Sequence, residues 1–496
     1  MKGRIVIDRD RIIGKINANI YGHLLEHMSR CIYGGIYEEN SKFSDKMGLR
    51  KDVLDVLRRI KPSIIRWPGG NFASAYQWED GIGTKEKRVI RYDPVWQVEE
   101  NNQFGTQEFM SLCQRLDAEP YICVNLGNGS MREAINWVEY CNYDGNSYYA
   151  RLRRSHGHTE PYMVKYWGLG NEIWSPAQIG HKSASDYAKR AREFAKAMKR
   201  VDPGIKLVAV GENDPEWDYE VVRVLGEHID YISIHAYFSP LCAEYDKAMA
   251  ISEVVEDRTK VLKGVIDAGT DSSYNHIKIS WDEWNLLGWI CHEKHLENDN
   301  NSSYNLQNAL VTASILNVFQ RLCSVVTMAC YSPVVNIRGA FFVHPKGVVL
   351  RPQYHVFDLY ANHSGGIALD PLVESASYEC ALISELGTFK YLPLPETVRV
   401  KYLDVSVTYD RKKLFVAVVN KHKQENITCQ IELEKFGSDY SRATVYEINH
   451  RNLDAYNDID CPEEIHIERK ELSNLKRSFT YDFPAHSITG IEVQTR

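Results

Sequence analysis

The sequence predicts an α/β protein in which a (β/α)8 TIM barrel is joined to a C-terminal β-sandwich of the jelly-roll type. Two patterns lead to this fold class. Up to about residue 370, eight short apolar stretches alternate with eight segments of helical periodicity, and beyond it apolar and polar residues alternate with period two. We therefore expect the barrel to span residues 19–369 and the sandwich to combine residues 1–18 with residues 370–496.

The eight predicted barrel strands are apolar runs that end in polar residues. In a barrel the C-terminal end of each strand faces the site, which accounts for the polar endings. The strands are expected at Ile20–His27, Ser63–Trp67, Pro120–Leu126, Val164–Glu172, Lys206–Glu212, Tyr231–Tyr237, Lys278–Asn285 and Val325–Asn336.

The eight predicted helices carry apolar residues at helical spacing. In Ser185–Val201, for example, Tyr187, Ala191 and Met198 share one face while charged residues take the other. The other seven are expected at Leu49–Lys61, Thr106–Leu116, Arg132–Cys141, Glu220–His228, Ile251–Asp267, Leu306–Leu322 and Tyr354–Asn362.

The predicted sandwich is a set of short strands with turn residues between them. These strands are expected at Val398–Tyr409, Leu414–Val419, Ile427–Leu433, Ala443–Ile448 and Ser487–Val493. A further strand, Gly3–Ile7, precedes the barrel pattern, and we expect it to pair with the second domain.

Composition excludes several classes of function. The chain has 59 Lys and Arg against 66 Asp and Glu, a net charge of −7, and so lacks the positive excess that nucleic-acid binding needs. Its apolar stretches fall short of the ~18 residues of a spanning helix, and its N-terminus has no apolar signal-peptide core. The 11 Cys include no C-x-x-C pair, which favours a reducing compartment. We expect a cytoplasmic protein that binds neither nucleic acid nor membrane.

Polar residues at the ends of the predicted strands are the candidates for chemistry. Among them, Glu172 ends the fourth strand and Glu283 the seventh, three places apart around a ring of eight, so their carboxylates can face each other. Retaining glycosidases hold two carboxylates ~5–5.5 Å apart, and inverting ones ~6.5–9.5 Å apart. A salt-bridged residue at the rim is the plainer alternative for either. The full set is Glu26, His27, Arg66, Asn125, Asn171, Glu172, Glu212, His235, Tyr237, Glu283 and Asn336.

Six motifs extend along most of the chain. They are Gly22-His23-Leu24-Leu25-Glu26-His27, Arg66-Trp67-Pro68-Gly69-Gly70-Asn71-Phe72, Trp96 with Asn102-Gln103-Phe104-Gly105, Gly168-Leu169-Gly170-Asn171-Glu172, His235-Ala236-Tyr237 and Asp282-Glu283-Trp284-Asn285. With these motifs the chain resembles glycoside hydrolase family 51, the α-L-arabinofuranosidases.

The resemblance implies a retaining, exo-acting hydrolase that removes terminal α-L-arabinofuranosyl units from arabinan and arabinoxylan oligosaccharides without a cofactor or a metal. It implies that Glu172 is the acid/base and Glu283 the nucleophile. Relatives are commonly hexamers, which implies a homo-oligomer. The residues expected to bind the substrate are Glu26, Arg66, Asn71, Trp96, Asn171, His235 and Tyr237.

The residue types suit these roles. Asn171 can hydrogen-bond the sugar 2-hydroxyl, a contact that strengthens in the transition state. Arg66 can keep Glu283 ionised, and Tyr237 can donate a further bond to it. Glu172 has to hold its proton near neutral pH, which calls for partial burial beside a negative charge.

Three alternatives stay open. His23-Leu24-Leu25-Glu26-His27 matches the H-x-x-E-H pattern of a zinc peptidase. A β-xylosidase or β-glucanase with the same fold, or a non-catalytic sugar-binding module, also fits parts of the pattern. The preferred linkage is uncertain because the chain departs from the family around the residues expected on the aglycone side: Ala177, Leu287, Trp289 and Gln353.

Overall fold

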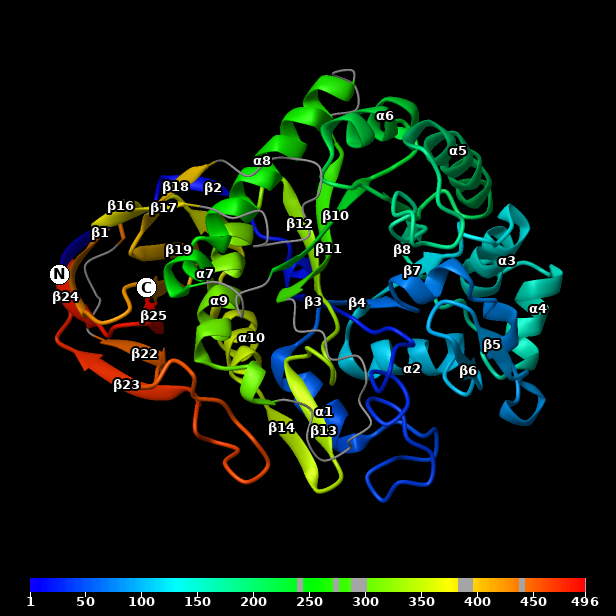
Figure 1. Ribbon diagram of the computed structural model, residues 1–496, viewed down its shortest axis with the longest axis horizontal. Helices are drawn as coiled ribbons and strands as arrows, with labels where there is room; N and C mark the ends of the chain where they lie inside the picture. Colours follow the sequence, from blue (N-terminus) through cyan, green and yellow to red (C-terminus); the bar gives the residue numbers. More distant parts are fainter. Residues whose placement is uncertain (239–243, 271–275, 287–300, 382–395, 437–441, 496) are drawn as a thin grey trace.

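A computed structural model describes residues 1–238, 244–270, 276–286, 301–381, 396–436 and 442–495. Figure 1 shows helices arranged around a barrel, with a mostly-strand domain on one side of it. Eight parallel strands close the barrel in the order β10-β11-β12-β3-β4-β7-β8-β9. The last strand joins the first in sequence through the pair Cys330 and Gly22.

All eight predicted barrel strands are confirmed. Their bounds are β3 Gly22–Leu24, β4 Ile64–Trp67, β7 Glu119–Val124, β8 Tyr166–Leu169, β9 Lys206–Ala209, β10 Tyr231–Phe238, β11 Lys278–Leu286 and β12 Val326–Tyr331. Several are shorter than predicted. The residues before β3 form a 3₁₀ turn, Ala18–Tyr21, and β8 ends before Gly170 and Glu172, which have φ of 89° and 42°. Left-handed backbone of this kind cannot continue a strand, so Glu172 lies on a turn at the barrel mouth.

The eight predicted helices are confirmed as well. They are α1 Lys51–Ile60, α2 Thr106–Leu116, α3 Met131–Asn142, α5 Ala184–Val201, α6 Pro215–Leu225, α8 Ile251–Gly269, α9 Leu306–Arg321 and α10 Pro352–His363. Helix α6 begins five residues earlier than predicted because Asp214 caps it and Pro215 occupies its first turn. Two short helices were not predicted, α4 Tyr148–Ser155 and α7 Tyr245–Met249.

Two hairpins extend from the barrel. The first, β5 Arg91–Asp93 with β6 Val98–Glu100, follows β4, and the second is β13 Phe341–His344 with β14 Gly347–Leu350. A pair of 3₁₀ turns, Asn71–Ser74 and Trp78–Gly81, lies between β4 and the first hairpin. These loops sit at the C-terminal ends of the strands, where a barrel builds its site.

The second domain consists of two main sheets that share one apolar core. A four-stranded sheet has the order β16-β1-β21-β24, and a seven-stranded sheet has the order β2-β15-β19-β20-β25-β22-β23. The predicted N-terminal strand is confirmed, since β1 pairs with both β16 and β21. The bounds are β1 Lys2–Asp8, β2 Ile12–Lys15, β15 Ile367–Leu369, β16 Leu372–Glu374, β19 Leu403–Tyr409, β20 Lys413–Asn420, β21 Ile427–Glu434, β22 Arg442–Ile448, β23 Glu468–Ser473, β24 Ser478–Phe483 and β25 Ser487–Gln494.

The predicted strand Val398–Tyr409 is divided in two. Its first part, β18 Thr397–Lys401, pairs with β17 Ser377–Ala381 in a separate hairpin, and only the second part, β19, enters the large sheet. The division of the chain into residues 19–369 against 1–18 and 370–496 stays a prediction. Strand β15, at the end of the first range, already pairs with β19.

The nine cysteines among the described residues are all free, and only Cys461 is exposed. Eight of them therefore pack as small apolar side chains. Within the described parts of the chain, no helix is long and apolar enough to cross a membrane.

Candidate active site

Two glutamates from opposite parts of the barrel meet at its mouth. Glu172, on the turn after β8, and Glu283, in β11, each place a carboxylate oxygen within 4.8 Å of the other and of a ring nitrogen of His235. The Glu172 side chain is 18% exposed, whereas that of Glu283 is 7% exposed. The structure thus brings together the two carboxylates that the strand ends singled out.

Glu283 is held at both carboxylate oxygens. Arg66, in β4, donates through Nη1 to Oε1 at 2.6 Å, and the Tyr237 hydroxyl donates to Oε2 at 2.6 Å. Burial alone would raise the pKa of Glu283, but the charges of His235 and Arg66 and the bond from Tyr237 outweigh burial and lower it. Glu283 is therefore an ionised carboxylate with a fixed orientation, which is what a nucleophile requires.

Asp282, which precedes Glu283 in β11, contacts both Arg66 and His235. It accepts a bond from the Tyr121 hydroxyl at 2.6 Å, lies 2.9 Å from Nε2 of His235, and lies 3.6 Å from Nε of Arg66. Consecutive side chains of a regular strand point to opposite faces. The register of β11 shifts against β12 between Trp281 and Trp284, and this irregularity lets both Asp282 and Glu283 face Arg66.

His235 lies between the carboxylates. It donates through Nδ1 to Oε1 of Glu172 at 2.9 Å and through Nε2 to Oδ1 of Asp282 at 2.9 Å. Burial alone would lower its pKa, but the charges of Glu283 and Asp282 outweigh burial and raise it to about 10. At neutral pH the ring is a cation that donates from both nitrogens. Its predicted contact with the substrate stays a prediction.

Among the described residues, Glu172, His235 and Glu283 form the group whose donor atoms are close enough to hold a metal ion. A metal needs a lone pair on the histidine nitrogen. Both ring nitrogens of His235 already lie 2.9 Å from carboxylate oxygens, so a metal ion there would have to replace the contacts with Glu172 or Asp282.

Glu26 lies close enough to Glu283 for their charges to interact. Its Oε1 accepts bonds from the backbone N–H of Phe72 at 3.1 Å and from Nε1 of Trp96 at 3.2 Å. Burial raises the pKa of Glu26, the negative charge of Glu283 adds to the effect, and the result is a pKa of about 7. A Cβ atom at Gly70 would lie 2.6 Å from Oε1 of Glu283 and 3.1 Å from Oε2 of Glu26, so only glycine fits at this point of the loop.

The amides around Glu172 form a chain. Asn171 accepts from Nη2 of Arg66 at 2.8 Å and donates to Oδ1 of Asn71 at 3.2 Å. Gln178 donates to the same oxygen of Asn71 and lies 3.5 Å from Oε2 of Glu172. Sequence reasoning assigned no contact to Gln178. Its place in the Gln178-Ile179-Gly180 run was the available signal, but the loop conformation is what brings it to Glu172.

The other candidates have structural contacts. Asn125 donates to Asn128, and Asn336 donates to the Arg30 carbonyl, so both fasten loops. Gln353 is buried in the first turn of α10, and Ala177 is exposed. Leu287 and Trp289 lie outside the described residues.

The zinc-peptidase alternative is wrong in its geometry. His23 packs on Phe357 with ring centroids 4.8 Å apart, and burial lowers its pKa to about 3. His27 lies 2.9 Å from Glu100 through Nδ1 and accepts from the Trp67 indole through Nε2. The two histidines are not on one helical face, as the H-x-x-E-H pattern requires, and the ring nitrogens of His27 are already used.

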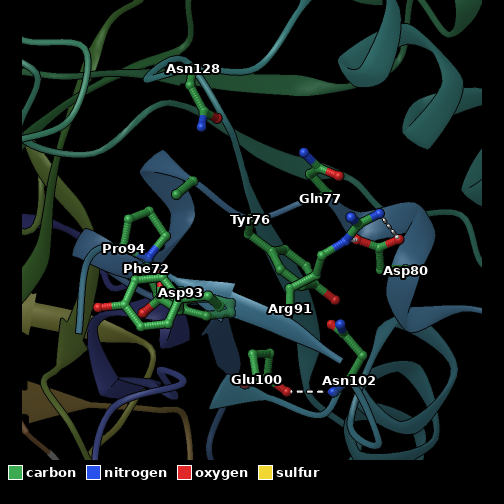
Figure 2. Close-up of a pocket in the computed structure, with 12 residues that line it drawn as sticks. Phe72, Tyr76, Gln77, Asp80, Arg91, Asp93, Pro94, Glu100, Asn102 and Asn128 are labelled. Carbon is green, nitrogen blue, oxygen red and sulfur yellow. Dashed lines mark hydrogen bonds and ion pairs between the residues drawn. The ribbon is translucent and has the colours of Figure 1, made fainter. Parts of the chain in front are cut away.

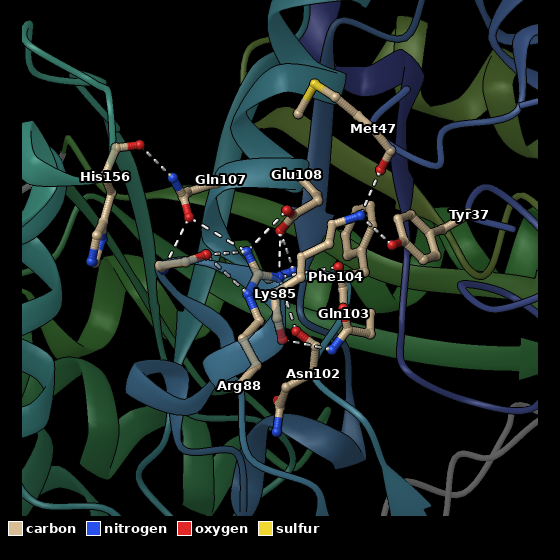
Figure 3. Close-up of polar contacts among 12 residues, drawn as sticks. Tyr37, Met47, Lys85, Arg88, Asn102, Gln103, Phe104, Gln107, Glu108 and His156 are labelled. Atoms are coloured by element: carbon tan, nitrogen blue, oxygen red, sulfur yellow. Dashed lines mark hydrogen bonds and ion pairs between the residues drawn. The ribbon is translucent and has the colours of Figure 1, made fainter. Parts of the chain in front are cut away.

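A separate buried cluster holds the hairpin that carries Trp96 (Figure 3). Arg88 donates to both oxygens of Glu108, in α2, at 2.9 and 3.0 Å. It also donates to the carbonyls of Gly83 and Asn102, which lie on the two sides of the hairpin. Such bidentate, charge-assisted bonds are geometrically specific. Arg88 therefore ties both ends of the β5–β6 hairpin to the barrel.

Comparisons with known proteins find α-L-arabinofuranosidases along nearly the whole chain. The model of the alpha-L-arabinofuranosidase 1 domain matches residues 56–251, and that of the alpha-L-arabinofuranosidase C-terminal domain matches residues 282–487. Alpha-L-arabinofuranosidase C of Emericella nidulans is 36% identical over 513 residues, covering 98% of this chain and 96% of its own. The intracellular exo-alpha-(1->5)-L-arabinofuranosidase 1 of Bacillus subtilis is 34% identical over 478 residues and covers 92% of each chain.

Solved structures are similar over the same length. The alpha-L-arabinofuranosidase of Thermotoga maritima in complex with arabinose has a TM-score of 0.91 and 38% identity, covering 99% of this chain and all of its own (100%). The GH51 enzyme of Thermotoga petrophila has a TM-score of 0.90 and 38% identity, with the same coverage of 99% and 100%.

Proposed function

The chain belongs to glycoside hydrolase family 51, the α-L-arabinofuranosidases, and we propose that it works by retention, with Glu283 as the nucleophile and Glu172 as the acid/base. One observation supports this assignment above all. The carboxylate oxygens of Glu172 and Glu283 approach within 4.8 Å, close to the ~5–5.5 Å of retaining enzymes and below the ~6.5–9.5 Å that an intervening water needs in inverting ones.

In the first step, a carboxylate oxygen of Glu283 attacks the anomeric carbon of the terminal arabinofuranosyl unit. The bond to the leaving oxygen breaks, and Glu172 transfers its proton to that oxygen. Arg66 and Tyr237 orient the attacking carboxylate. In the second step Glu172 takes a proton from water, the water oxygen attacks the anomeric carbon, and Glu283 leaves as a carboxylate. Two displacements at one carbon retain its configuration.

His235 assists the change of role at Glu172. It donates to Oε1 of Glu172, which leaves Oε2 for the proton that is transferred. The negative charge of Glu283 is present before the first step and disappears once the sugar is attached, so the electrostatic surroundings of Glu172 differ between the two steps. In the intermediate, the cationic His235 then stabilises Glu172 as the base.

Substrate recognition rests on the polar groups around the two glutamates. Glu26 can accept bonds from furanose hydroxyls, and Asn171 can bond the 2-hydroxyl. Trp96 donates to Glu26, and Asn71 accepts from Asn171, so they help to hold the glycone subsite in shape.

The substrates are arabinose-containing oligosaccharides derived from arabinan and arabinoxylan, cleaved from the non-reducing end in the cytoplasm by a homo-oligomer, a hexamer, that requires neither metal nor cofactor. The names of the Bacillus subtilis relative, intracellular and exo-acting on α-(1→5) linkages, support the location and the mode of attack. We expect no nucleic-acid or membrane partner. The xylosidase and glucanase alternatives receive no comparable support.

Proton NMR of the first sugar released from a nitrophenyl α-L-arabinofuranoside tests this proposal. We expect the α-anomer to appear first and the activity to persist in EDTA. Release of the β-anomer before mutarotation, or loss of activity in the chelator, would overturn it.

A further inference from the structure

A pocket of about 190 Å³ lies beside the active site, between the β5–β6 hairpin and the 3₁₀ turns after β4 (Figure 2). Phe72 and Tyr76 come from the turns, and Asp93 and Pro94 come from the hairpin. Because its volume is below the ~300–1,000 Å³ of sites for drug-sized ligands, the pocket suits one small ring.

We propose that this pocket binds a second sugar unit of the same substrate, a pentosyl unit other than the one that is cleaved. The inference rests on the proposed function, because it assigns a substrate class to that enzyme: oligosaccharides in which two arabinofuranosyl substituents lie close together. The enzyme would then hold one substituent in the catalytic subsite and its neighbour in this pocket.

The lining combines the two kinds of group that recognise a sugar. The rings of Phe72, Tyr76 and Pro94 supply apolar faces, which suit the C–H face of a sugar. The amides of Gln77 and Asn128 belong to exposed residues in the wall (Figure 2) and can donate to and accept from hydroxyls.

Charged groups close the opposite wall. Arg91 donates to both oxygens of Asp80 at 2.8 and 3.2 Å, which links the hairpin to the turn Trp78–Gly81. Paired in this way, the two side chains present polar edges to the pocket without a net charge. The other two carboxylates of the lining, Asp93 and Glu100, already accept backbone N–H bonds from Trp96 and Asn102. The pocket therefore favours a neutral polyhydroxyl ligand over an anion.

Both walls of the pocket connect directly to the catalytic subsite. The ring of Phe72 lines the pocket while its backbone N–H donates to Glu26. Asp93 accepts from the backbone N–H of Trp96 at 2.8 Å, and the Trp96 indole donates to the same oxygen of Glu26. Two sugars bound on the two sides of these residues would be close neighbours, as two substituents of one oligosaccharide are.

The pocket is also formed in advance. Arg88 fastens both ends of the hairpin to α2 (Figure 3), and the Asp93 carboxylate accepts from the N–H groups of Val95 and Trp96. A hairpin that is held in place loses little conformational entropy when a ligand binds.

Two variants test the proposal, each assayed on a nitrophenyl α-L-arabinofuranoside and on xylo-oligosaccharides that carry two neighbouring arabinofuranosyl substituents. Gln77→Ala removes a polar contact at an exposed position, and Ala75→Leu fills the pocket. We expect each to lower kcat/KM on the doubly substituted oligosaccharide about three- to tenfold, the value of one or two hydrogen bonds, through KM. Activity on the nitrophenyl substrate should stay within about twofold.

Glu99→Ala is the matched control, because Glu99 is exposed next to the pocket residue Glu100 and points to the other face of the same hairpin. This variant should leave kcat/KM on both substrates unchanged. Unchanged kinetics of Gln77→Ala on both substrates, or an equal loss on both, would overturn the second sugar site. A wild-type protein inactive on the nitrophenyl substrate would instead overturn the proposed function. Should Ala75→Leu fail to fold, the exposed Gln77→Ala still decides.

Discussion

Two buried clusters of arginine and carboxylate lie in different parts of this molecule and differ in their balance of charge. At the barrel mouth, Arg66 contacts Asp282 and Glu283. At the junction of α9 with the sandwich, Asp404 is paired with both Arg321 at 2.6 Å and Lys421 at 2.9 Å. The cluster at the barrel mouth has more carboxylates than cations. In the other cluster, Arg321 also pairs with Glu256 and Lys421 with Glu253, and Lys260 pairs with Glu256, so that cations and carboxylates are equal in number.

The difference appears in the pKa values. Burial alone would raise the pKa of Asp404, but Arg321 and Lys421 outweigh burial and hold it well below the usual range. At the barrel mouth, Arg66 and His235 form ion pairs with Glu172, Asp282 and Glu283. Burial and the charge of Glu283 raise the pKa of Glu26 to about 7. A balanced cluster stabilises a fold, whereas an excess of carboxylate leaves groups that can exchange protons near neutral pH.

The largest expected effect on activity is at the barrel mouth, where carboxylates outnumber cations. Glu283→Ala should lower kcat by at least about 10⁴-fold, as removal of a nucleophile does, because the carboxylate proposed to attack the anomeric carbon is gone. Added azide should restore turnover and give a product of inverted configuration. The melting temperature should not fall, since the change removes one of several like charges. Full activity in this variant would show that the nucleophile lies elsewhere.

The balanced cluster should respond in the opposite way. Asp404→Ala removes the buried carboxylate that both Arg321 and Lys421 contact at the domain junction, and breaking a buried pair costs about 3–5 kcal/mol. We expect the free energy of unfolding in urea to fall by that amount while kcat/KM of the folded protein is unchanged. Glu434→Ala, at an exposed ion pair with Arg477, is the control and should cost about 0–1 kcal/mol. If Asp404→Ala lost activity while its stability was unchanged, the claim that this cluster stabilises the fold and the barrel-mouth cluster carries the chemistry would be wrong.

A smaller effect is expected at Glu26. Charge-assisted bonds are worth about 1.5–3 kcal/mol each, so Glu26→Ala should lower kcat/KM about ten- to a hundredfold or more. The melting temperature should change little, because Glu26 faces a polar site. Wild-type kinetics would remove Glu26 from substrate binding, and a large loss of stability in proportion to activity would make its role structural.

The smallest effect concerns pH. The pKa of His235 in the folded protein is about 10, against ~6.5 in an unfolded chain. A raised pKa contributes stability that is fully present below ~6.5 and is lost as pH rises towards 10. The difference in melting temperature between the wild type and His235→Asn should therefore shrink from pH 6.5 to pH 10. A constant difference would mean that His235 is not held as a cation.

Much of the fold was predictable from the sequence, because each strand and helix has its own periodicity. The positions of Glu172 and Glu283 followed from the same pattern, since polar residues that end barrel strands point to one face. The structure confirms all eight strand and helix pairs, although the ends shift where a cap or a left-handed turn intervenes, as at Pro215 and Gly170.

The surroundings of the glutamates were less predictable. Asp282 faces Arg66 because of a register shift in β11, and Gln178 reaches Glu172 through the conformation of a loop. Arginine is usually found on the surface, but Arg88 is buried because it contacts Asn102 and Glu108, which lie in later segments of the chain. These features depend on tertiary packing, and local periodicity carries no signal for them.

The most direct test of the central claim is to trap the intermediate. Glu172→Ala should still form a glycosyl-enzyme from a nitrophenyl arabinofuranoside, whose leaving group needs no proton, and should break it down slowly for lack of a base. Peptide mass spectrometry after rapid acid quenching should then find one arabinofuranosyl unit on Glu283. An adduct on another residue, or no adduct in a variant that still releases nitrophenol in a burst, would contradict the assignment of the two carboxylates.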